Sequence, residues 1–361
     1  MKRVLILNGD SFVGIQTAKT FFYSKEYEVS VTLTNRDDDT ALKVRYTPPK
    51  KDAATLNPIV IRGEPLSVKE TLSALDGEKN EEEEEILIPA ALQPYIQHVV
   101  PSHNANPEAF CRLLLEQDVV VAVLEDDSYE AECAIKVLLG SHYEVEKTFV
   151  LVSSVMTWAY TVPSERSRAR AAKREEMERE RLNFLEEREE GEEEEEIPEH
   201  LTEEYIQKQF EGELDDEEGE ALVPMRTFTE ADYGLRVPHP RYQQWKMIEH
   251  LTKHANSESL HTYVLFAGLP YGQGEGELQG YLRKAMQQAV LPLYGSGLNH
   301  IPMIHVDDLA AIIFKVGNSY DVLEDRYMFA VDRGNITQAQ LLNCLSRRIG
   351  GVIRPAPWHR A

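Results

Sequence analysis

The sequence predicts an α/β protein built on a doubly wound parallel sheet. Short apolar segments of strand length alternate with amphipathic segments of helix length along the first 152 residues. The run 119–124 is apolar throughout, as expected for a parallel strand that is buried on both faces. A glycine-containing turn, residues 8–14, joins the first expected strand to the first expected helix at the spacing of a βαβ unit.

The individual elements follow from these patterns in chain order. Loops are expected where charge or proline accumulates, so the acidic run 81–85 is assigned to a loop. Thr337 is expected to cap the last helix, which stops at a glycine pair. The expected strands are 4–7, 29–33, 96–100, 119–124, 148–152 and 262–266, and the expected helices are 15–23, 107–116, 129–139, 242–253, 278–288 and 336–350.

Most of the negative charge lies in two segments. The chain of 361 residues carries a net charge of −24. Residues 164–220 contain 24 acidic and 9 basic side chains, and residues 78–85 contain six acidic and one basic, which leaves −4 for everything else. A nearly neutral folded part has no surface that matches a phosphate backbone, so we expect no binding to nucleic acid.

The segment 164–222 is expected to be a long acidic insertion outside the core. Its first part, 165–188, has good helix formers with opposite charges three and four residues apart, which favours a solvated helix. Its acid-only remainder is typical of disorder. Two interpretations stay open: a surface insertion that the fold tolerates, or an arm that binds a partner.

Cysteine usage and hydropathy predict a soluble protein of the cytoplasm. The three cysteines lie far apart and form no CxxC pair or Cys/His cluster, so we expect neither a disulfide framework nor a metal site. The sequence enters an apolar strand directly, and no apolar run reaches the 18 residues of a membrane span. We therefore expect no signal peptide and no membrane contact.

The turn after the first strand is where a Rossmann-type protein would hold a dinucleotide. Glycines are needed there because side chains would keep the pyrophosphate away from the amides at the helix N-terminus. Against the pattern GxxGxxG the three positions are Asn8, Ser11 and Gly14, so only the last glycine is kept, and Asp10 adds a carboxylate where phosphate would lie. A working dinucleotide site and a merely structural turn both stay open. Arg36 would meet a 2′-phosphate, or it is simply a surface charge. The predicted contacts to NAD or NADP are Gly9, Ser11, Phe12, Val13, Gly14, Arg36, Leu124, Ser153, Tyr242 and Lys246.

A second set of residues has the chemistry of a dehydrogenase. Ser153 and Ser154 end an apolar strand, and Tyr242 and Lys246 are spaced as in YxxxK. On one helix face Lys246 would lie beside the Tyr242 hydroxyl and favour its ionisation, while Ser154 would hydrogen-bond the same substrate oxygen. The candidate catalytic residues are therefore Ser154, Tyr242 and Lys246, and the alternative is an ordinary surface tyrosine and lysine.

The C-terminal half resembles that of the extended short-chain dehydrogenases. The resemblance rests on the segments 263–272, 291–297 and 304–310, in this order and spacing. It implies a Rossmann-type domain with a small C-terminal lobe, in which Ser154, Tyr242 and Lys246 correspond to the catalytic Ser/Thr, Tyr and Lys of the family. The family usually has arginine where Phe266 stands, which puts a substrate or anion contact at that position in doubt.

A closer resemblance is to the dehydrogenase-like N-terminal region of the ciliary adenylate kinases of the isoenzyme-seven type. It rests on Ser-Val-Met-Thr-Trp-Ala at 154–159 and on the segments 228–233, 268–276 and 301–310. It implies a place, the axoneme of a cilium or flagellum, and axonemal proteins as partners. It does not imply kinase activity, because the phosphate-binding motif GxxxxGK[ST] is absent from the 361 residues.

The predicted organisation has four parts. Residues 1–163 form the first part of the Rossmann core and 223–272 the second part, separated by the insertion 164–222. Residues 273–361 form a small C-terminal lobe of the substrate-binding type, with a segment that returns to the core. His305 and the pair Asp307-Asp308 look like a metal or acid/base cluster, but we assign them to a helix start.

Three functions are compatible with the sequence. The first is a non-catalytic or weakly nucleotide-binding domain that serves the assembly of the axoneme, and its motivation is the eroded glycine turn. The alternative is an NAD(P)-dependent oxidoreductase or epimerase that uses Ser154, Tyr242 and Lys246. A third, a nucleotide-metabolising subunit acting with a separate kinase chain, rests on analogy alone.

Overall fold

The structure, a computed structural model, describes residues 1–34, 41–46, 59–60, 84–125, 127–161, 233–234, 236–274, 276–320, 322–334 and 336–356, and the single residues 177, 180, 198, 202 and 228. The insertion predicted at 164–222 and the predicted cofactor contact Arg36 therefore lie outside the described residues, apart from isolated positions. The chain divides into two compact units. The first comprises Met1–Thr157, Pro238–Gly280 and Pro302–Gly334, and the second comprises Trp158–Val237, Tyr281–Ile301 and Asn335–Ala361.

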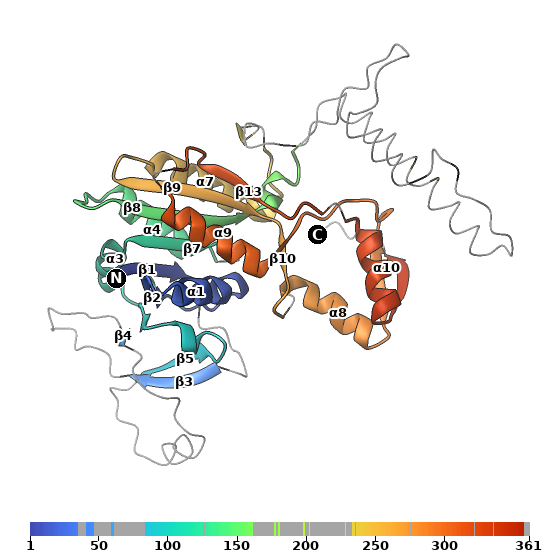
Figure 1. Cartoon of the computed structure of the whole chain (residues 1–361), viewed down its shortest axis with the longest axis horizontal. Coiled ribbons are helices and arrows are strands. Elements are labelled where there is room, and N and C mark those ends of the chain that lie inside the picture. Colours follow the sequence, from blue (N-terminus) through green and yellow to red (C-terminus); the bar gives the residue numbers. More distant parts are fainter. Residues whose placement is uncertain are drawn as a thin grey trace, which may run out of the picture. The chain divides into compact units, whose positions relative to one another are not determined.

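The first unit is built on a mostly parallel sheet with the strand order β13-β9-β8-β7-β1-β2-β6-β4 (Figure 1). Every neighbouring pair in it is parallel except β4 with β6. The predicted doubly wound parallel sheet is therefore confirmed. Its strands are β1 (Lys2–Leu7), β2 (Tyr27–Val31), β4 (Ile59–Val60), β6 (His98–Val99), β7 (Val119–Val123), β8 (Lys147–Ser154), β9 (Leu260–Ala267) and β13 (Tyr327–Ala330).

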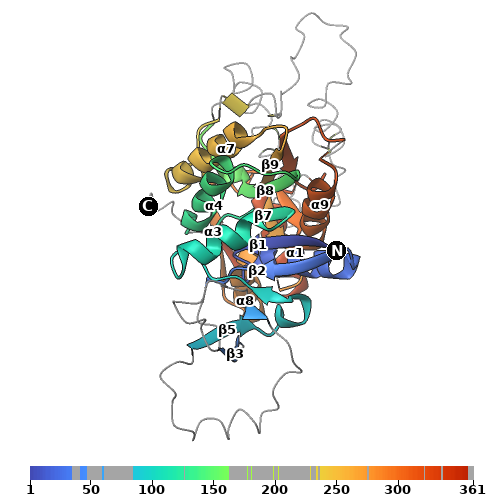
Figure 2. The ribbon, with the colours of Figure 1, turned by 90° about the vertical axis from the view of Figure 1, so that its left-hand side faces the viewer.

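Helices cover both faces of this sheet (Figure 2). On one face α1 (Phe12–Ser24) packs beside α9 (Val306–Asn318). On the other face α4 (Tyr129–Leu139) packs between α3 (Pro107–Leu115) and α7 (Gln243–Ala255). All five residues of β7 are buried, because a central parallel strand between two helical layers has no solvent side.

The direction of strand addition reverses at β1. The chain runs from β1 to β2 on one side, whereas β7 and β8 are added on the other side of β1. At such a switch point the loops that leave the carboxyl ends of two neighbouring strands turn in opposite directions, which opens a crevice between them. The structure therefore places a crevice at the carboxyl ends of β1, β2 and β7.

In the part of the chain that the structure describes, three short strand pairs lie outside the large sheet. In the first unit β10 (Leu269–Tyr271) runs parallel to β12 (Met303–His305), and β3 (Ala41–Tyr46) pairs antiparallel with β5 (Glu84–Pro89). The assignment of 81–85 to a loop is therefore wrong for Glu84 and Glu85, which belong to β5. Pairing with β3 outweighs the low strand propensity of glutamate.

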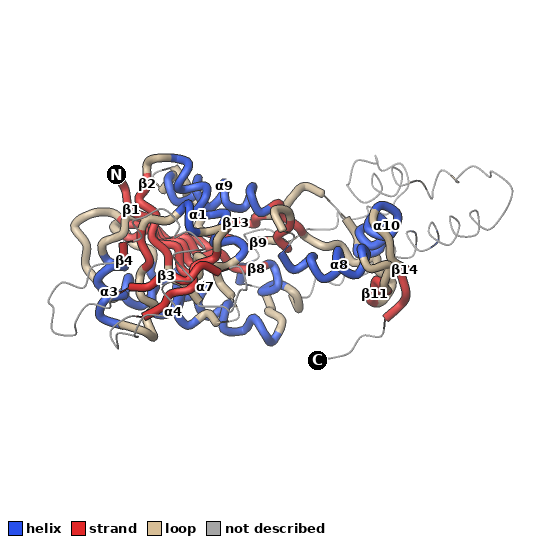
Figure 3. The backbone as a smooth tube through the Cα atoms, turned by 90° about the horizontal axis from the view of Figure 1, so that it is seen from below, coloured by secondary structure: helices blue, strands red, loops and turns tan. Residues whose placement is uncertain are grey.

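The second unit has a small core of its own. Its β11 (Val290–Tyr294) pairs in parallel with β14 (Val352–Ala356), near α8 (Gln279–Met286) and α10 (Gln338–Arg348) (Figure 3). The predicted cap of the last helix is confirmed, because the Thr337 hydroxyl accepts from the Gln340 amide at 3.2 Å. The core residues are Ala285, Leu291 and Leu342.

Four 3₁₀ turns lie within the described residues. The turns are η2 (Gln93–Tyr95), η3 (Val155–Trp158), η6 (Pro240–Tyr242) and η7 (Gly276–Leu278). Within the described ranges, every helix falls short of the length and hydropathy that a bilayer crossing requires.

Candidate functional site

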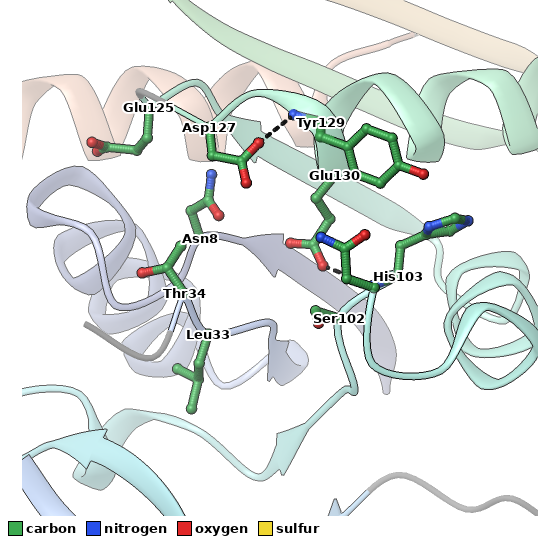
Figure 4. Close-up of a pocket in the computed structure, with 10 residues that line it drawn as sticks. Asn8, Leu33, Thr34, Ser102, His103, Glu125, Asp127, Tyr129 and Glu130 are labelled. Atoms are coloured by element: carbon green, nitrogen blue, oxygen red, sulfur yellow. Dashed lines mark hydrogen bonds between the residues drawn. The ribbon is translucent and has the colours of Figure 1, made fainter. Parts of the chain in front are cut away.

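A polar cavity lies in the crevice at the carboxyl ends of β1, β2 and β7 (Figure 4). Its volume is about 460 Å³, which is in the range of small-molecule sites. The walls come from the ends of β1 and β2, from the segments that follow β6 and β7, and from the first turn of α4. The lining residues are Asn8, Leu33, Thr34, Ser102, His103, Asn104, Glu125, Asp127, Tyr129 and Glu130.

Asn8 occupies the first glycine position of the turn and bridges the crevice. Its backbone is left-handed, with a φ of 57°, a conformation that asparagine tolerates better than most side chains. The Asn8 amide Nδ2 donates to the Val123 carbonyl at 2.8 Å, and the Asn8 backbone N–H donates to Thr32 Oγ1 at 3.1 Å. The side chain thus ties the end of β1 to the end of β7, where a glycine would leave room for a pyrophosphate.

Ser11 and Gly14, the other two glycine positions, serve the packing of α1. The Ser11 hydroxyl is the N-cap of the helix and accepts from the Gly14 amide at 3.0 Å, so this amide is already paired. A Cβ on Gly14 would lie 2.4 Å from the Asn8 carbonyl oxygen, and a Cβ on Gly9 would lie 2.6 Å from the Val31 Cβ. Close packing against neighbouring atoms therefore requires both glycines, with no ligand involved.

The other residues predicted to line the turn also face the protein interior. Val13 is 7% exposed and belongs to the core. The Phe12 ring lies against Gly276, where a Cβ would come within 2.9 Å of two ring carbons. The Leu124 amide donates to the Val152 carbonyl at 3.0 Å. These contacts hold the turn and the end of β7 in place without a ligand.

Asp10 puts a carboxylate beside the turn and fixes it to the end of β2. Both of its oxygens accept from the Thr34 amide at 3.0 Å, and one accepts from the Thr34 hydroxyl at 2.6 Å. A carboxylate held there repels phosphate oxygens.

Glu130 is the most buried acid of the cavity. Its carboxylate accepts from the Thr32 hydroxyl at 2.6 Å and from the His103 amide at 3.3 Å. Burial raises the pKa of Glu130, the hydrogen bonds from Thr32 and His103 oppose this shift, and the charges of Asp10 and Asp127 add to it. Sequence reasoning missed this residue because an acid in the first turn of a helix is an ordinary feature.

The lining does not fit a dinucleotide. Its described side chains include the three carboxylates Glu125, Asp127 and Glu130 and neither lysine nor arginine. The helix amide of Gly14 is paired with Ser11, and Asn8 spans the switch point. A pyrophosphate would meet acceptors and negative charge instead of the free amides that bind it in dinucleotide sites.

The predicted catalytic residues lie on neighbouring elements. Ser154 ends β8, Tyr242 ends η6 directly before α7, and Lys246 lies in the first turn of α7, which packs beside β8. The Ser154 hydroxyl accepts from the Met156 amide at 3.2 Å. The Tyr242 ring meets the Trp245 ring edge-on, with centroids 4.8 Å apart.

Ser153 and Phe266 are interior residues. The Ser153 hydroxyl donates to the buried carboxylate of Glu249 on α7. Phe266, at the position where the resembling family usually has arginine, is fully buried on β9 with its ring 5.4 Å from that of Phe329. Both side chains make these contacts inside the protein.

Together the sheet, its switch point and the crevice define a Rossmann-type domain, and its fold is similar to that of dehydratases and epimerases of known structure. Among solved structures, a dTDP-glucose 4,6-dehydratase from Bacillus anthracis in complex with NAD has a TM-score of 0.53 at 13% identity, over 99% of this chain and 86% of that one. A UDP-N-acetylglucosamine 4-epimerase from Bacillus cereus has a TM-score of 0.51 at 10% identity, over 99% and 89%. At this identity the likeness shows the fold.

The sequence is homologous to adenylate kinase 7. The protein of that name from Mus musculus is 28% identical over 257 residues, which are 68% of this chain and 33% of the relative. That from Macaca fascicularis is 37% identical over 103 residues, 28% of this chain and 19% of the relative. No family model matches the chain. The chain thus contains a dehydrogenase-like region similar to adenylate kinase 7, and the aligned part spans a third or less of these relatives.

Proposed function

We propose that this chain is a dehydrogenase-derived domain that has lost dinucleotide chemistry and acts as an assembly component of the ciliary or flagellar axoneme. The observation that carries the first half is the turn 8–14. In it Asn8 bridges to Val123, Ser11 pairs the Gly14 amide, and Asp10 supplies a carboxylate. A Rossmann domain that does not hold a pyrophosphate lacks the electron carrier of a dehydrogenase.

The second half of the proposal is supported by homology. The similarity to adenylate kinase 7 extends over 68% of the chain. The sequence motifs that carry this likeness imply a cytoplasmic protein that belongs to the axoneme of a cilium or flagellum, with axonemal proteins as partners. Fold alone does not specify function, so the place and the partners need a direct test.

Cofactor binding is tested by calorimetric titration and thermal shift with NAD⁺, NADH, NADP⁺ and NADPH at up to millimolar concentration. The wild-type chain is compared with Tyr242→Phe. We expect no binding of any of the four to either protein, because the turn and the carboxylates oppose the pyrophosphate. Tight binding, with a turnover that Tyr242→Phe abolishes, would overturn the proposal.

That outcome would support the alternative, an NAD(P)-dependent oxidoreductase or epimerase. One observation favours it: Tyr242 and Lys246 begin a helix that packs beside the strand ending in Ser154, as the chemistry requires. A dehydratase of the same fold is in complex with NAD. The contrary evidence is the lining of the crevice, where a cofactor would bind. It does not concern these three residues.

The axonemal role is tested in ciliated cells that express the tagged chain. After detergent removal of the membrane, we expect the chain to sediment with the axonemes and to resist extraction by moderate salt. A second arm uses Tyr242→Phe, which should sediment equally if the role is non-catalytic. Recovery of the wild-type chain entirely in the detergent-soluble fraction would contradict the assembly role.

A further inference from the structure

The cavity at the switch point is rich in hydrogen-bond acceptors. Figure 4 shows Asp127 and Glu130 around the same opening as Asn8, whereas Glu125 points to the other side. Asp127 uses one carboxylate oxygen to accept from the Tyr129 amide at 3.0 Å. Leu33, which is 7% exposed, is the aliphatic residue of the lining. These walls suit a ligand that supplies donors and positive charge.

Asn8 is a buried residue whose side-chain oxygen Oδ1 accepts no hydrogen bond within the described part of the chain. The residue is 3% exposed, and its hydrogen bonds in the described structure are made by the backbone and by the amide Nδ2. The orientation of the amide is fixed, because the Val123 carbonyl must receive a donor. The Asn8 Oδ1 therefore remains available to a donor in the cavity, independently of the carboxylates.

A single metal ion does not match this arrangement. Among the described residues, no three His, Cys, Asp or Glu side chains come close enough together to hold one ion. The acceptors are spread around a cavity of about 460 Å³ instead of converging on one point. Such spacing matches a ligand whose donor groups are separated by several atoms.

We propose that this cavity binds a small organic cation with several ammonium groups, of the linear polyamine class. One ammonium group donates to Glu130 and to the Asn8 Oδ1, a second donates to Asp127, and the methylene chain between them lies against Leu33. Hydrogen bonds between ammonium groups and carboxylates are among the stronger ones in proteins. This binding role goes beyond axonemal assembly and does not depend on it.

The test is calorimetric titration of the full chain with spermidine in 150 mM sodium chloride, a salt concentration that screens exposed charges. We expect saturable binding at one site. Glu130→Gln and Asn8→Gly should each weaken it about tenfold, because the first removes the negative charge that faces the ammonium group and the second removes an acceptor. Asn8→Gly suits the left-handed backbone at this position.

Asp127→Asn keeps the test decisive if the buried variants fold poorly. Asp127 is exposed, and asparagine preserves an acceptor for the Tyr129 amide while removing the charge, so folding should be unaffected and binding about fivefold weaker. The matched control is Glu132→Gln, on the neighbouring helix α4. Glu132 pairs with Lys136, outside the cavity, and its replacement should leave the affinity unchanged.

Two results would overturn the inference. Equal affinity in wild type, Asp127→Asn and Glu132→Gln would show that spermidine binds only as a counterion of the acidic chain. The absence of saturable binding at 1 mM, on the order of the weakest specific affinities, would exclude the site. Either result leaves the dinucleotide test unaffected, so failure here is distinguishable from failure of the proposed function.

Discussion

The Ser153 hydroxyl donates a hydrogen bond to the Glu249 carboxylate, which joins the end of β8 to α7. The two residues are 3% and 0% exposed. A buried carboxylate without donors is costly, so this bond helps to hold α7 against the sheet. Tyr242 and Lys246 lie at the start of the same helix. Ser153, which the sequence predicts as a cofactor contact, therefore helps to position the helix that begins with the candidate catalytic pair.

Ser153→Ala should destabilise the chain by about 1–3 kcal/mol, because it removes a donor from a buried charged group. Urea unfolding followed by circular dichroism measures the difference. Ser154→Ala is the matched control: its hydroxyl is part-exposed and accepts only from the Met156 amide among its described bonds, so the loss should stay below about 1 kcal/mol. Equal losses in the two variants would contradict the interpretation.

Gly14→Ala should be among the most destabilising single changes in the chain. The added Cβ would lie 2.4 Å from the Asn8 carbonyl oxygen and 2.9 Å from the Gly9 Cα, and backbone atoms yield little. We expect a loss of about 3 kcal/mol. Gly280→Ala on α8 is the control, since its Cβ would meet no atom within 4 Å, and it should stabilise by up to about 1 kcal/mol. Similar effects in the two variants would be the contrary result.

The sequence predicts the long elements well because their patterns are strong. The central strands are continuous apolar runs, and α4 coincides with its predicted range, 129–139. The helix start at His305 is also confirmed, since its ring nitrogen accepts from the Asp307 amide at 3.3 Å. Periodicity and caps are local signals, so they survive without tertiary information.

The missed elements lack such local signals. β4, β10 and β12 have two or three residues each, and β5 begins in a run of glutamates. Pairing with segments that are distant in the sequence therefore decides whether they form strands. The site is missed for the same reason. Its acids, Asp127 and Glu130, are ordinary helix-start residues in sequence and become one lining only because three strands end side by side. The bridge from Asn8 to Val123 spans 115 residues and leaves no mark in the sequence.

Tyr27 predicts how stability depends on alkaline pH. Burial, with smaller contributions from Glu26 and Asp118, raises the pKa of Tyr27 to about 12, and its hydroxyl donates to Asn318 on α9. In the unfolded chain the phenol loses its proton near pH 10. Between about pH 10 and 12 the folded state therefore holds the proton more tightly, and stability falls as the pH rises.

Tyr27→Phe should remove this alkaline decline, which amounts to roughly 2–3 kcal/mol by pH 12. At neutral pH the same variant should lose about 1 kcal/mol with the bond to Asn318. Urea midpoints between pH 8 and 11 measure both effects. Tyr160→Phe, at a side chain that is 53% exposed, should keep the wild-type slope. An unchanged slope in Tyr27→Phe would assign the decline to other groups.

The insertion can be tested by removal, because the chain leaves and returns at adjacent points. The Tyr160 amide donates to the Val237 carbonyl at 2.9 Å, and the Val237 amide donates to the Thr161 hydroxyl at 2.9 Å. Close by, the buried Arg236 guanidinium lies 3.6 Å from the centroid of the Tyr233 ring and donates to the Tyr233 carbonyl at 2.9 Å. A deletion must therefore keep residues 233–237.

Replacing residues 165–220 with a short glycine-serine linker should leave the melting temperature unchanged within about 2 °C, since shortening a surface connection alters loop entropy only slightly. Circular dichroism and calorimetry measure the transition. Sedimentation with axonemes then separates the two interpretations of the segment: an arm that binds a partner predicts lost sedimentation at unchanged stability, whereas a tolerated insertion predicts no change in either. A large fall in melting temperature would place part of the segment in the core, contrary to both.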